Sequence, residues 1–251
     1  MVHFIGAGPG APDLITLRGR ELLTKADQVI YAGSLVNPAL LGFCREGCRI
    51  LNSAEMTLEQ VISAMEETEA VHGTTVRLHT GDPCLYGAIR EQMDELDRKK
   101  IAYDITPGVS SFCGAAAAAE TEYTLPGVTQ TVIITRMGGR TPVPQREGMA
   151  SLAQHGAAMV IFLSAGLVRS VQADLLKGAY TEKTPCAIVF KATWPEEKVI
   201  HTTLGELSKA MEINGITHTA LILVGNFLGG GYDRSKLYDP EFTTGYRKAT
   251  S

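Results

Sequence analysis

Short β-rich runs alternate with helical patterns through the first half of the chain, and this alternation limits the fold more than any other feature. The runs lie at residues 2–5, 28–31, 49–51, 75–79 and 102–106. Apolar residues recur at helical spacing in 57–71 and 89–99, and the alanine-rich stretch 111–120 is typical of a closely packed helix. Strands that alternate with helices predict a parallel sheet covered by helices. We therefore expect a first α/β domain with a five-stranded, mainly parallel sheet.

A second set of strands follows a break at Leu125-Pro126-Gly127. These runs lie at residues 131–135, 158–163, 186–190, 199–203 and 220–224. Only a short turn at Pro195-Glu196-Glu197 separates the third run from the fourth, which predicts a hairpin and hence a mixed sheet. The chain is thus predicted to be an α/β protein of two domains, residues 1–121 and 122–228, with a tail at 229–251. The tail has no periodicity and is expected to lie over the surface or to cross to a partner subunit.

The first glycine loop, residues 6–11, resembles a dinucleotide-binding loop at first sight but lacks what that site needs. Pro9 and Pro12 have no N–H group to offer a pyrophosphate, and the next helical pattern begins only near Thr16. After the second run, Ala32-Gly33-Ser34 contains no acidic residue to bind a ribose. A nicotinamide or flavin site is therefore not expected.

Composition excludes several classes of partner. The 251-residue chain has a net charge of −4, which gives no reason to expect nucleic acid or an anionic membrane as partner. Its apolar runs are strand-sized and fall short of the roughly 18 residues of a membrane span. The five cysteines are odd in number and lack the spacing of a zinc site, so we expect free thiols and no metal. The N-terminus enters a strand without a signal-like region, and a cytoplasmic location is expected.

Three glycine-bearing turns follow predicted strands, at residues 6–11, 79–87 and 106–111. Each alone could be a simple strand-to-helix turn, with Asp82 or Ser110 as a helix cap. Parallel strands, however, bring all three turns to the carboxyl edge of one sheet, where open α/β sheets bind ligands. Three such loops at one edge favour a binding site over three unrelated turns.

These loops carry a family resemblance. Gly6-Ala7-Gly8-Pro9-Gly10, Thr80-Gly81-Asp82-Pro83 and Pro107-Gly108-Val109-Ser110-Ser111 are similar to the three signature loops of the tetrapyrrole methylases, which use S-adenosylmethionine. Later segments resemble the branch of that family that methylates a corrin precursor at C11 in cobalamin biosynthesis. These segments are residues 31–36, 129–131, 139–144, 191–195, 214–216 and 232–238.

The resemblance implies that S-adenosylmethionine is bound in a cleft between the two domains and leaves as S-adenosylhomocysteine. Residues of the first domain that would contact it are Pro9, Thr80, Gly81, Asp82, Leu85, Ser110 and Ser111. Residues that would contact it from the second domain are Leu163, Ser164, Ala192, Ala220 and Leu221. Glycine-loop backbone suits a methionine moiety and a ribose, and small or apolar residues suit an adenine.

Methyl transfer of this kind asks for alignment and exclusion of water more than for acid–base groups. A base could still be needed to remove a proton from the macrocycle. The related uroporphyrinogen methyltransferases carry an acidic residue where this chain has Ala32-Gly33, so the base is left unassigned. Tyr86, His79 and Glu120 are candidates by position only, and a structural role is the simpler interpretation of each.

The implied substrate bears many carboxylates, so an acidic protein must gather positive charge locally. We expect Arg140, Arg136 and Lys191, together with Tyr86, to bind this substrate, with Arg146 and Arg234 as weaker candidates. Arg140 stands out because it lies in a Gly-Gly-Arg-Thr-Pro loop, which is poor scaffolding. The single tryptophan, Trp194, is expected in the core, with a subunit interface or the macrocycle site as alternatives.

Three functions remain as hypotheses. The first is S-adenosylmethionine-dependent methylation of a corrin precursor, by a homodimer as is typical of the family. The second keeps the cofactor but methylates another tetrapyrrole, a protein or an RNA. The third is a non-enzymatic tetrapyrrole carrier or a metal chelatase, which six scattered histidines support poorly.

Overall fold

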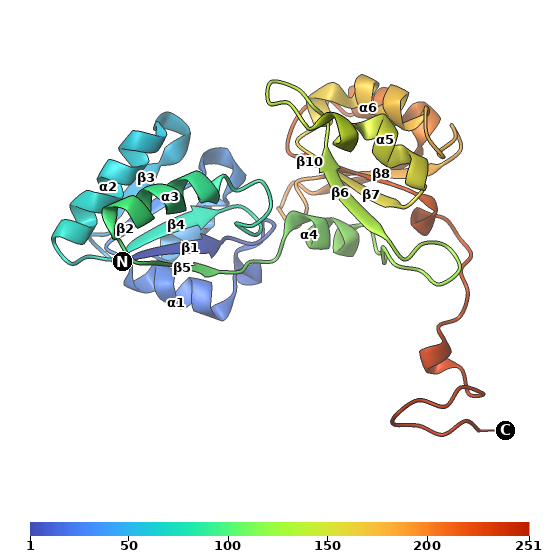
Figure 1. Ribbon diagram of the computed structural model, residues 1–251, viewed down its shortest axis with the longest axis horizontal. Coiled ribbons are helices and arrows are strands. Elements are labelled where there is room, and N and C mark those ends of the chain that lie inside the picture. Colours follow the sequence, from blue (N-terminus) through green and yellow to red (C-terminus); the bar gives the residue numbers. More distant parts are fainter. Residues whose placement is uncertain (251) are drawn as a thin grey trace. The chain divides into compact units, whose positions relative to one another are not determined.

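The computed structural model describes residues 1–250 and divides the chain into two compact units (Figure 1). The first unit comprises Met1–Ala115 and Lys191–Glu197, and the second comprises Ala116–Phe190 and the chain from Lys198 onward. The predicted domain bounds, 1–121, 122–228 and 229–251, stay a prediction. The two units are groups of residues in close contact, whereas a domain is a part of the chain that can fold independently.

The first unit contains a five-stranded sheet in the order β3-β2-β4-β1-β5, with every neighbouring pair parallel. Its strands are β1 (Val2–Gly6), β2 (Gln28–Tyr31), β3 (Arg49–Asn52), β4 (Thr75–His79) and β5 (Tyr103–Thr106). In the register of the central pair, Gly6 lies beside His79. The glycine loops after β1, β4 and β5 therefore leave three adjacent strands at the same edge.

Helices cover both faces of this sheet (Figure 1). They are α1 (Leu17–Lys25), α2 (Leu58–Ala70) and α3 (Ile89–Lys99), whereas α4 (Ser111–Ala118) follows the loop after β5. Ile5 and Leu78 pack with Leu23 of α1 on one face, whereas Phe4 and Ile30 pack with Met65 of α2 on the other. Covering of both faces leaves the central strands β1 and β4 buried along their whole length.

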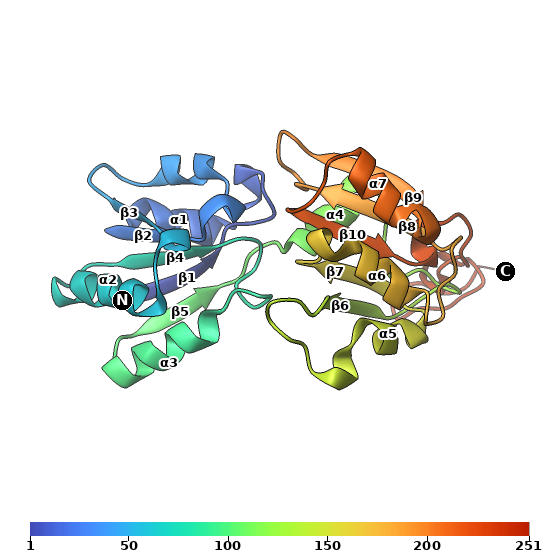
Figure 2. The same cartoon turned by 90° about the horizontal axis from the view of Figure 1, so that it is seen from above.

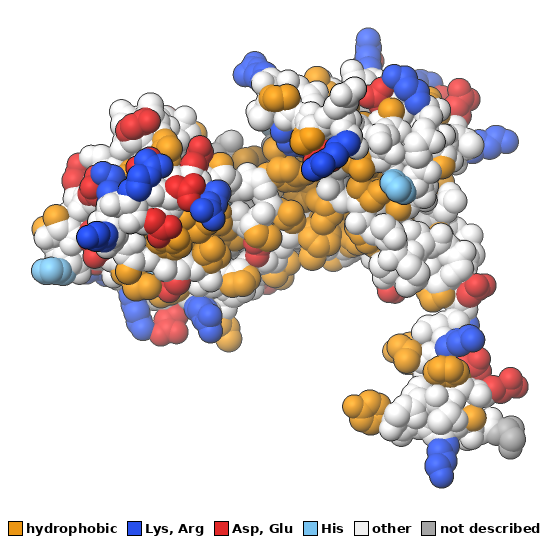
Figure 3. Space-filling view, in the orientation of Figure 1, with side chains coloured by type: hydrophobic (Ala, Val, Ile, Leu, Met, Phe, Trp, Pro, Cys, Tyr) orange, Lys and Arg blue, Asp and Glu red, His pale blue; other side chains and the backbone are white. Residues whose placement is uncertain are grey.

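Local signals in the sequence set the ends of these helices. The Thr16 hydroxyl accepts a hydrogen bond from the Gly19 amide at the start of α1, and Thr57 with Gln60 forms a capping box at the start of α2. The outer faces of α2 and α3 carry charges of both signs (Figure 3). One ion pair joins Lys99 of α3 to Glu66 of α2. Both helices are thus amphipathic covers of a buried sheet.

The second unit contains a mixed sheet in the order β6-β7-β10-β8-β9. Its strands are β6 (Val132–Arg136), β7 (Ala158–Phe162), β8 (Pro185–Phe190), β9 (Lys198–Thr203) and β10 (Ala220–Val224). Only β6 and β7 are parallel, and β8 and β9 form the predicted antiparallel hairpin.

One face of the second sheet packs against α5 (Met149–Leu152), α6 (Val168–Leu175) and α7 (Leu207–Ile213) (Figure 2). Ile161, Ile188 and Ile222 point to this face and are fully buried with Val171 and Leu207. On the central strands, the alternate residues Val160, Ala187 and Leu223 are also buried. The sheet therefore forms the centre of its unit's core.

Short 3-10 helices connect the main elements. They are Pro12–Leu14, Gly33–Leu35, Pro38–Phe43, Ser53–Glu55, Gln145–Glu147, Ala153–His155, Ala165–Leu167, Leu204–Glu206, Asn226–Leu228 and Lys236–Tyr238. The tail joins the second unit through a hydrogen bond from the Asp233 amide to the Pro126 carbonyl, 2.9 Å long. Within residues 1–250, no helix is long and apolar enough to span a bilayer.

The α/β class, the parallel first sheet and the mixed second sheet are all confirmed. Each predicted strand is present, with ends displaced by one residue at most, and α4 ends two residues before the predicted 120. The helix after the first loop begins at Leu17, as the interpretation of that loop requires. Its late start leaves the loop without the helix N-terminus of a dinucleotide site.

Candidate active site

The first two glycine loops are joined to each other by backbone hydrogen bonds. The Ala7 amide donates to the His79 carbonyl at 2.7 Å, and Gly8 and Gly81 exchange bonds of 3.3 and 2.8 Å in a single antiparallel bridge. The first two loops thus extend the contact of β1 with β4 beyond the ends of both strands.

Close packing explains the glycine of the third loop. A Cβ atom on Gly108 would lie 2.2 Å from the Gly81 oxygen and 2.7 Å from the Gly6 Cα atom. Both neighbours are backbone atoms and cannot rotate away, so a side chain at this position would push the loops apart. The three loops therefore form one interlocked edge.

Asp82 ties the second loop to the third. One carboxylate oxygen accepts the Gly108 amide at 2.9 Å, and the other accepts the Cys84 amide at 2.8 Å. Burial raises the pKa of Asp82, but hydrogen bonds from the Cys84 thiol and from these two amides outweigh it, so the pKa lies below its usual value. The ionised Asp82 carboxylate therefore has a structural role, which is to hold the second and third loops together.

The remaining predicted residues of the first unit line the same loops. Pro9, Gly81 and Ser110 are buried, while Thr80, Leu85 and Ser111 are half-buried. Tyr86 is 43% exposed and has a φ of 57°. A left-handed backbone at a tyrosine is costly, and such strain is typical of functional loops.

The predicted residues of the second unit gather at one end of its sheet. Arg136 ends β6 beside Phe162 of β7, and Ala220 opens β10 beside Phe190 of β8. Because β10 runs antiparallel to β7, its first residues reach the end of β7, where Leu163 and Ser164 follow. Ala192 follows the end of β8 but belongs to the first unit, in the segment Lys191–Glu197.

The neighbours Leu163 and Ser164 differ in the burial of their side chains. Ser164 is fully buried, and its hydroxyl donates to the Phe162 carbonyl at 2.6 Å and accepts the Met137 amide at 2.8 Å. Leu163 is 64% exposed and has a φ of 51°. Backbone strain of this kind is common at functional sites.

The cations proposed for substrate binding are held to different degrees. Arg136 donates to the carbonyls of Thr141 and Pro142 at 3.0 and 2.9 Å, and so holds the Gly-Gly-Arg-Thr-Pro loop. Arg140, at the tip of that loop, is exposed, as are Arg146 and Arg234. Lys191 lies 5.2 Å from the centre of the Trp194 ring and forms an ion pair with Glu196.

Trp194 is not in the core, and this expectation from the sequence was wrong. The side chain is half-buried, and its indole N–H donates to the Pro9 carbonyl at 3.2 Å. A tryptophan needs a partner for its N–H group when it leaves water, and here the first glycine loop supplies it.

The three candidate bases, His79, Glu120 and Tyr86, differ in burial and in surroundings. His79 is 3% exposed, and its Nε2 atom has no hydrogen-bond partner among residues 1–250. Burial, assisted by the nearby charge of Arg77, lowers the pKa of His79 to about 3, which makes it a poor base at neutral pH. Glu120 is exposed, with a φ of 49°. Tyr86 lies in the loop after β4, among the predicted cofactor residues.

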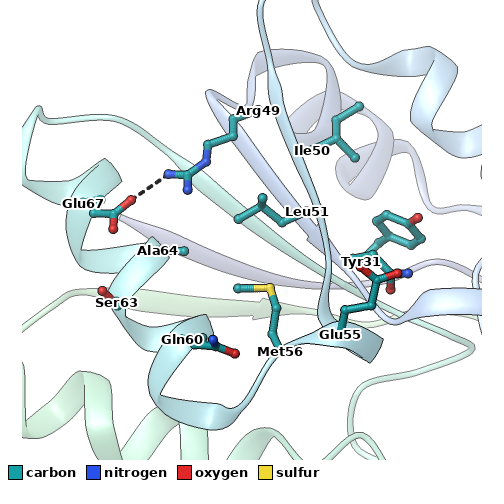
Figure 4. Close-up of a pocket in the computed structure, with 11 residues that line it drawn as sticks. Tyr31, Arg49, Ile50, Leu51, Glu55, Met56, Gln60, Ser63, Ala64 and Glu67 are labelled. Atoms are coloured by element: carbon teal, nitrogen blue, oxygen red, sulfur yellow. Dashed lines mark hydrogen bonds and ion pairs between the residues drawn. The ribbon is translucent and has the colours of Figure 1, made fainter.

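Sequence reasoning did not find a pocket of about 630 Å³ beside the edge strand β3 (Figure 4). β3 and α2 provide most of its lining, and Tyr31, Glu55 and Met56 complete it. An ion pair joins Arg49 to Glu67. Polar and apolar residues are mixed in its lining, and the sequence of these segments contains no motif that predicts a binding site. In the described part of the chain, no three His, Cys, Asp or Glu side chains are grouped to hold a metal ion.

Two sheets of this topology, with interlocked glycine loops at the carboxyl edge of the parallel one, are typical of α/β proteins that bind a ligand at that edge. Residues 1–208 match the tetrapyrrole (corrin/porphyrin) methylases. The chain belongs to this family.

Relatives match nearly the whole chain. A cobalt-precorrin-4 C(11)-methyltransferase of Methanocaldococcus jannaschii is 47% identical over 99% of this chain and 96% of its own length. A precorrin-4 C(11)-methyltransferase of Mycobacterium tuberculosis is 43% identical over 94% of this chain and 95% of its own. The crystal structure of a cobalt-precorrin-4 methyltransferase of cobalamin biosynthesis superposes with a TM-score of 0.89 at 46% identity, covering 91% of this chain and 96% of that one.

Proposed function

We propose that this protein transfers a methyl group from S-adenosylmethionine to C11 of precorrin-4 or cobalt-precorrin-4, giving precorrin-5 or its cobalt form in cobalamin biosynthesis. The observation that carries the proposal is identity of 43–47% over nearly the full length of relatives with that activity. The two relatives differ in whether cobalt is in the macrocycle, and the experiment below therefore uses both substrates.

Each sheet end, taken by itself, carries residues whose chemistry suits a part of the cofactor. When bound, S-adenosylmethionine supplies an electrophilic methyl group on a sulfonium. The rigid backbone of the Gly6, Gly81 and Gly108 loops suits the polar methionine and ribose parts, and the exposed, strained Leu163 suits an apolar ring. We assign cofactor binding to Pro9, Thr80, Gly81, Asp82, Leu85, Ser110, Ser111, Leu163, Ser164, Ala192, Ala220 and Leu221.

For two of these residues we propose an indirect role. Asp82 and Ser164 act through the backbone they hold, because their side-chain oxygens already bind neighbouring amides. Alignment of the two reactants by rigid loops is the main contribution that these residues make to the rate. The domain division at 121/122 and the tail from 229 are part of the same proposal.

The carboxylates of the corrin precursor are assigned to Arg140, Arg136 and Lys191, with Tyr86 at the strained loop. Arg140 is the best-supported of the three cations, because it is exposed at the tip of a loop that Arg136 holds in place. A guanidinium presented in this way can bind a carboxylate with two hydrogen bonds. Arg136 supports that loop and orients Arg140.

A homodimer in the cytoplasm completes the proposal. All five cysteines are free thiols, which fits a reducing compartment. The oligomeric state rests on the family resemblance and is tested by sedimentation equilibrium.

The decisive experiment incubates the protein and methyl-labelled S-adenosylmethionine with precorrin-4 in one reaction and with cobalt-precorrin-4 in another. We expect one further methyl group on the macrocycle, located at C11 by NMR, and micromolar binding of S-adenosylhomocysteine by calorimetry. Label found only in protein or RNA, or no binding of S-adenosylhomocysteine, would refute the proposal.

A further inference from the structure

The segment Lys191–Glu197 follows β8 of the second sheet but packs against the first glycine loop. Two hydrogen bonds join them. The Trp194 indole N–H donates to the Pro9 carbonyl at 3.2 Å, and the Ala11 amide donates to the Thr193 hydroxyl at 2.9 Å. These bonds lie on either side of Gly10, so both arms of the loop are held.

Trp194 also explains why residue 10 is a glycine. A Cβ atom there would lie 2.1 Å from indole Cδ1 and 2.3 Å from indole Nε1, and 2.8 Å from the Ala192 oxygen. Gly10 does not have a left-handed backbone, so its lack of a side chain reflects this contact and not a turn requirement. The indole ring fills the space that a side chain would occupy.

Pro9 is confined on its other side by α4. A Cβ atom on Gly114 would lie 2.7 Å from Pro9 Cβ and 3.1 Å from Pro9 Cγ, which places the proline ring directly on the helix backbone. Pro9 is therefore fixed between the Gly114 backbone and the hydrogen bond from Trp194.

The segment that presents Trp194 is itself rigidly built. Lys191 and Thr193 have φ values of 47° and 67°, and a left-handed backbone is a clear outlier for a β-branched residue. The Glu197 carboxylate accepts the Thr193 amide at 2.5 Å, and the Lys191 carbonyl accepts the Trp194 amide at 3.0 Å. Strain held by such bonds is typical of a segment whose position matters for function.

We infer that Trp194 is a positioning residue for cofactor binding: it acts through the Pro9 carbonyl and fixes the first glycine loop in its binding conformation. The inference rests on the proposed function, in which Pro9 contacts S-adenosylmethionine. A loop that is already ordered before binding loses less conformational freedom when the ligand arrives.

The test replaces Trp194 with phenylalanine, which keeps an aromatic ring and removes the N–H donor. We expect the Kd for S-adenosylhomocysteine, measured by calorimetry, to rise about 2- to 10-fold, as the loss of one neutral hydrogen bond implies. The KM for S-adenosylmethionine should rise while kcat changes less, and hydrogen exchange of a peptide spanning residues 6–15 should become faster without ligand. Tyr180→Phe is the matched control, since it removes a hydrogen bond from an aromatic side chain to the Ala157 carbonyl elsewhere and should change none of these values.

A second pair of variants tests the contact with Gly10. Gly10→Ala should weaken S-adenosylhomocysteine binding strongly in the wild-type background and less strongly in a Trp194→Ala background, because the smaller side chain leaves room for the new methyl group. Equal effects in the two backgrounds, or a Trp194→Phe variant with wild-type affinity and exchange, would overturn the inference. Failure of the wild-type protein to bind S-adenosylhomocysteine would instead refute the proposed function.

Discussion

Buried His79 should make the protein less stable in mildly acidic solution. The imidazole is 3% exposed, and no residue in the described chain accepts or donates a hydrogen bond at Nε2. Burial, then the charge of Arg77, lowers the pKa of His79 in the folded state to about 3. In the unfolded chain the pKa returns to about 6.5.

The sign of the effect follows from which state binds the proton. Between pH 6.5 and about 3 the unfolded state binds a proton at residue 79 and the folded state does not, so stability falls as the pH falls. At pH 5 the difference from the unfolded pKa is about 1.5 units, which corresponds to about 2 kcal/mol of lost unfolding free energy. The loss should be nearly absent at pH 7.5.

The assay is urea unfolding at pH 7.5, 6 and 5, followed by circular dichroism, for the wild-type protein and His79→Phe. Phenylalanine cannot be protonated, and it replaces a side chain that has an unsatisfied polar atom next to the ring of Phe4. The variant should lose about 2 kcal/mol less than the wild-type protein between pH 7.5 and pH 5. His155→Gln, which removes an exposed imidazole, serves as the control. Equal losses in wild-type protein and His79→Phe would show that the buried imidazole does not resist protonation.

Three further predictions concern the loops. Gly108→Ala should lower the unfolding free energy by about 3 kcal/mol and weaken S-adenosylhomocysteine binding, because its Cβ would lie 2.2 Å from a backbone oxygen. Gly42→Ala, which has open space around its Cβ, is the control and should have neither effect. Thermal melts measure the stability of both variants, and calorimetry measures their binding. Asp82→Asn keeps only one acceptor oxygen for two amides and should cost about 1.5–3 kcal/mol at pH 7. Because the folded-state pKa of Asp82 is lowered, urea unfolding in acid should show this cost shrinking as the pH falls below about 4; a constant cost would contradict the role of the ionised carboxylate. Ser164→Ala leaves the part-buried Met137 amide unpaired and should cost about 1–3 kcal/mol in urea unfolding. An unchanged midpoint would rule out that bond as a stabilising contact.

Much of the fold could be predicted from local patterns. Residues 28–31 and 75–79 form strands with the predicted ends, because apolar runs of strand length between helical patterns are a strong local signal. The glycine loops were recognisable for the same reason, since each follows a strand directly. Pro9 and Pro12 were enough to argue against a phosphate site, because a missing N–H group is a property of the residue itself.

The roles of single side chains were harder to predict. Arg136 stays a proposed substrate residue, but no sequence pattern predicted that its guanidinium also holds the backbone of residues 141 and 142. Ser164 stays a proposed cofactor residue, but its hydrogen bonds to the backbone at Phe162 and Met137 were not predictable either. Hydrogen-bond partners depend on loop conformations that no short sequence pattern specifies.

The sequence by itself determined the order of strands and helices along the chain, the α/β class and the three loops that meet at one sheet edge. These features follow from periodicity, turn chemistry and the geometry of parallel strands. Only the tertiary structure decided that Trp194 lies against Pro9, 185 residues away along the chain. Such a contact depends on where a hairpin tip packs after both sheets have formed, and the short turn at 195–197 contains no local signal of it.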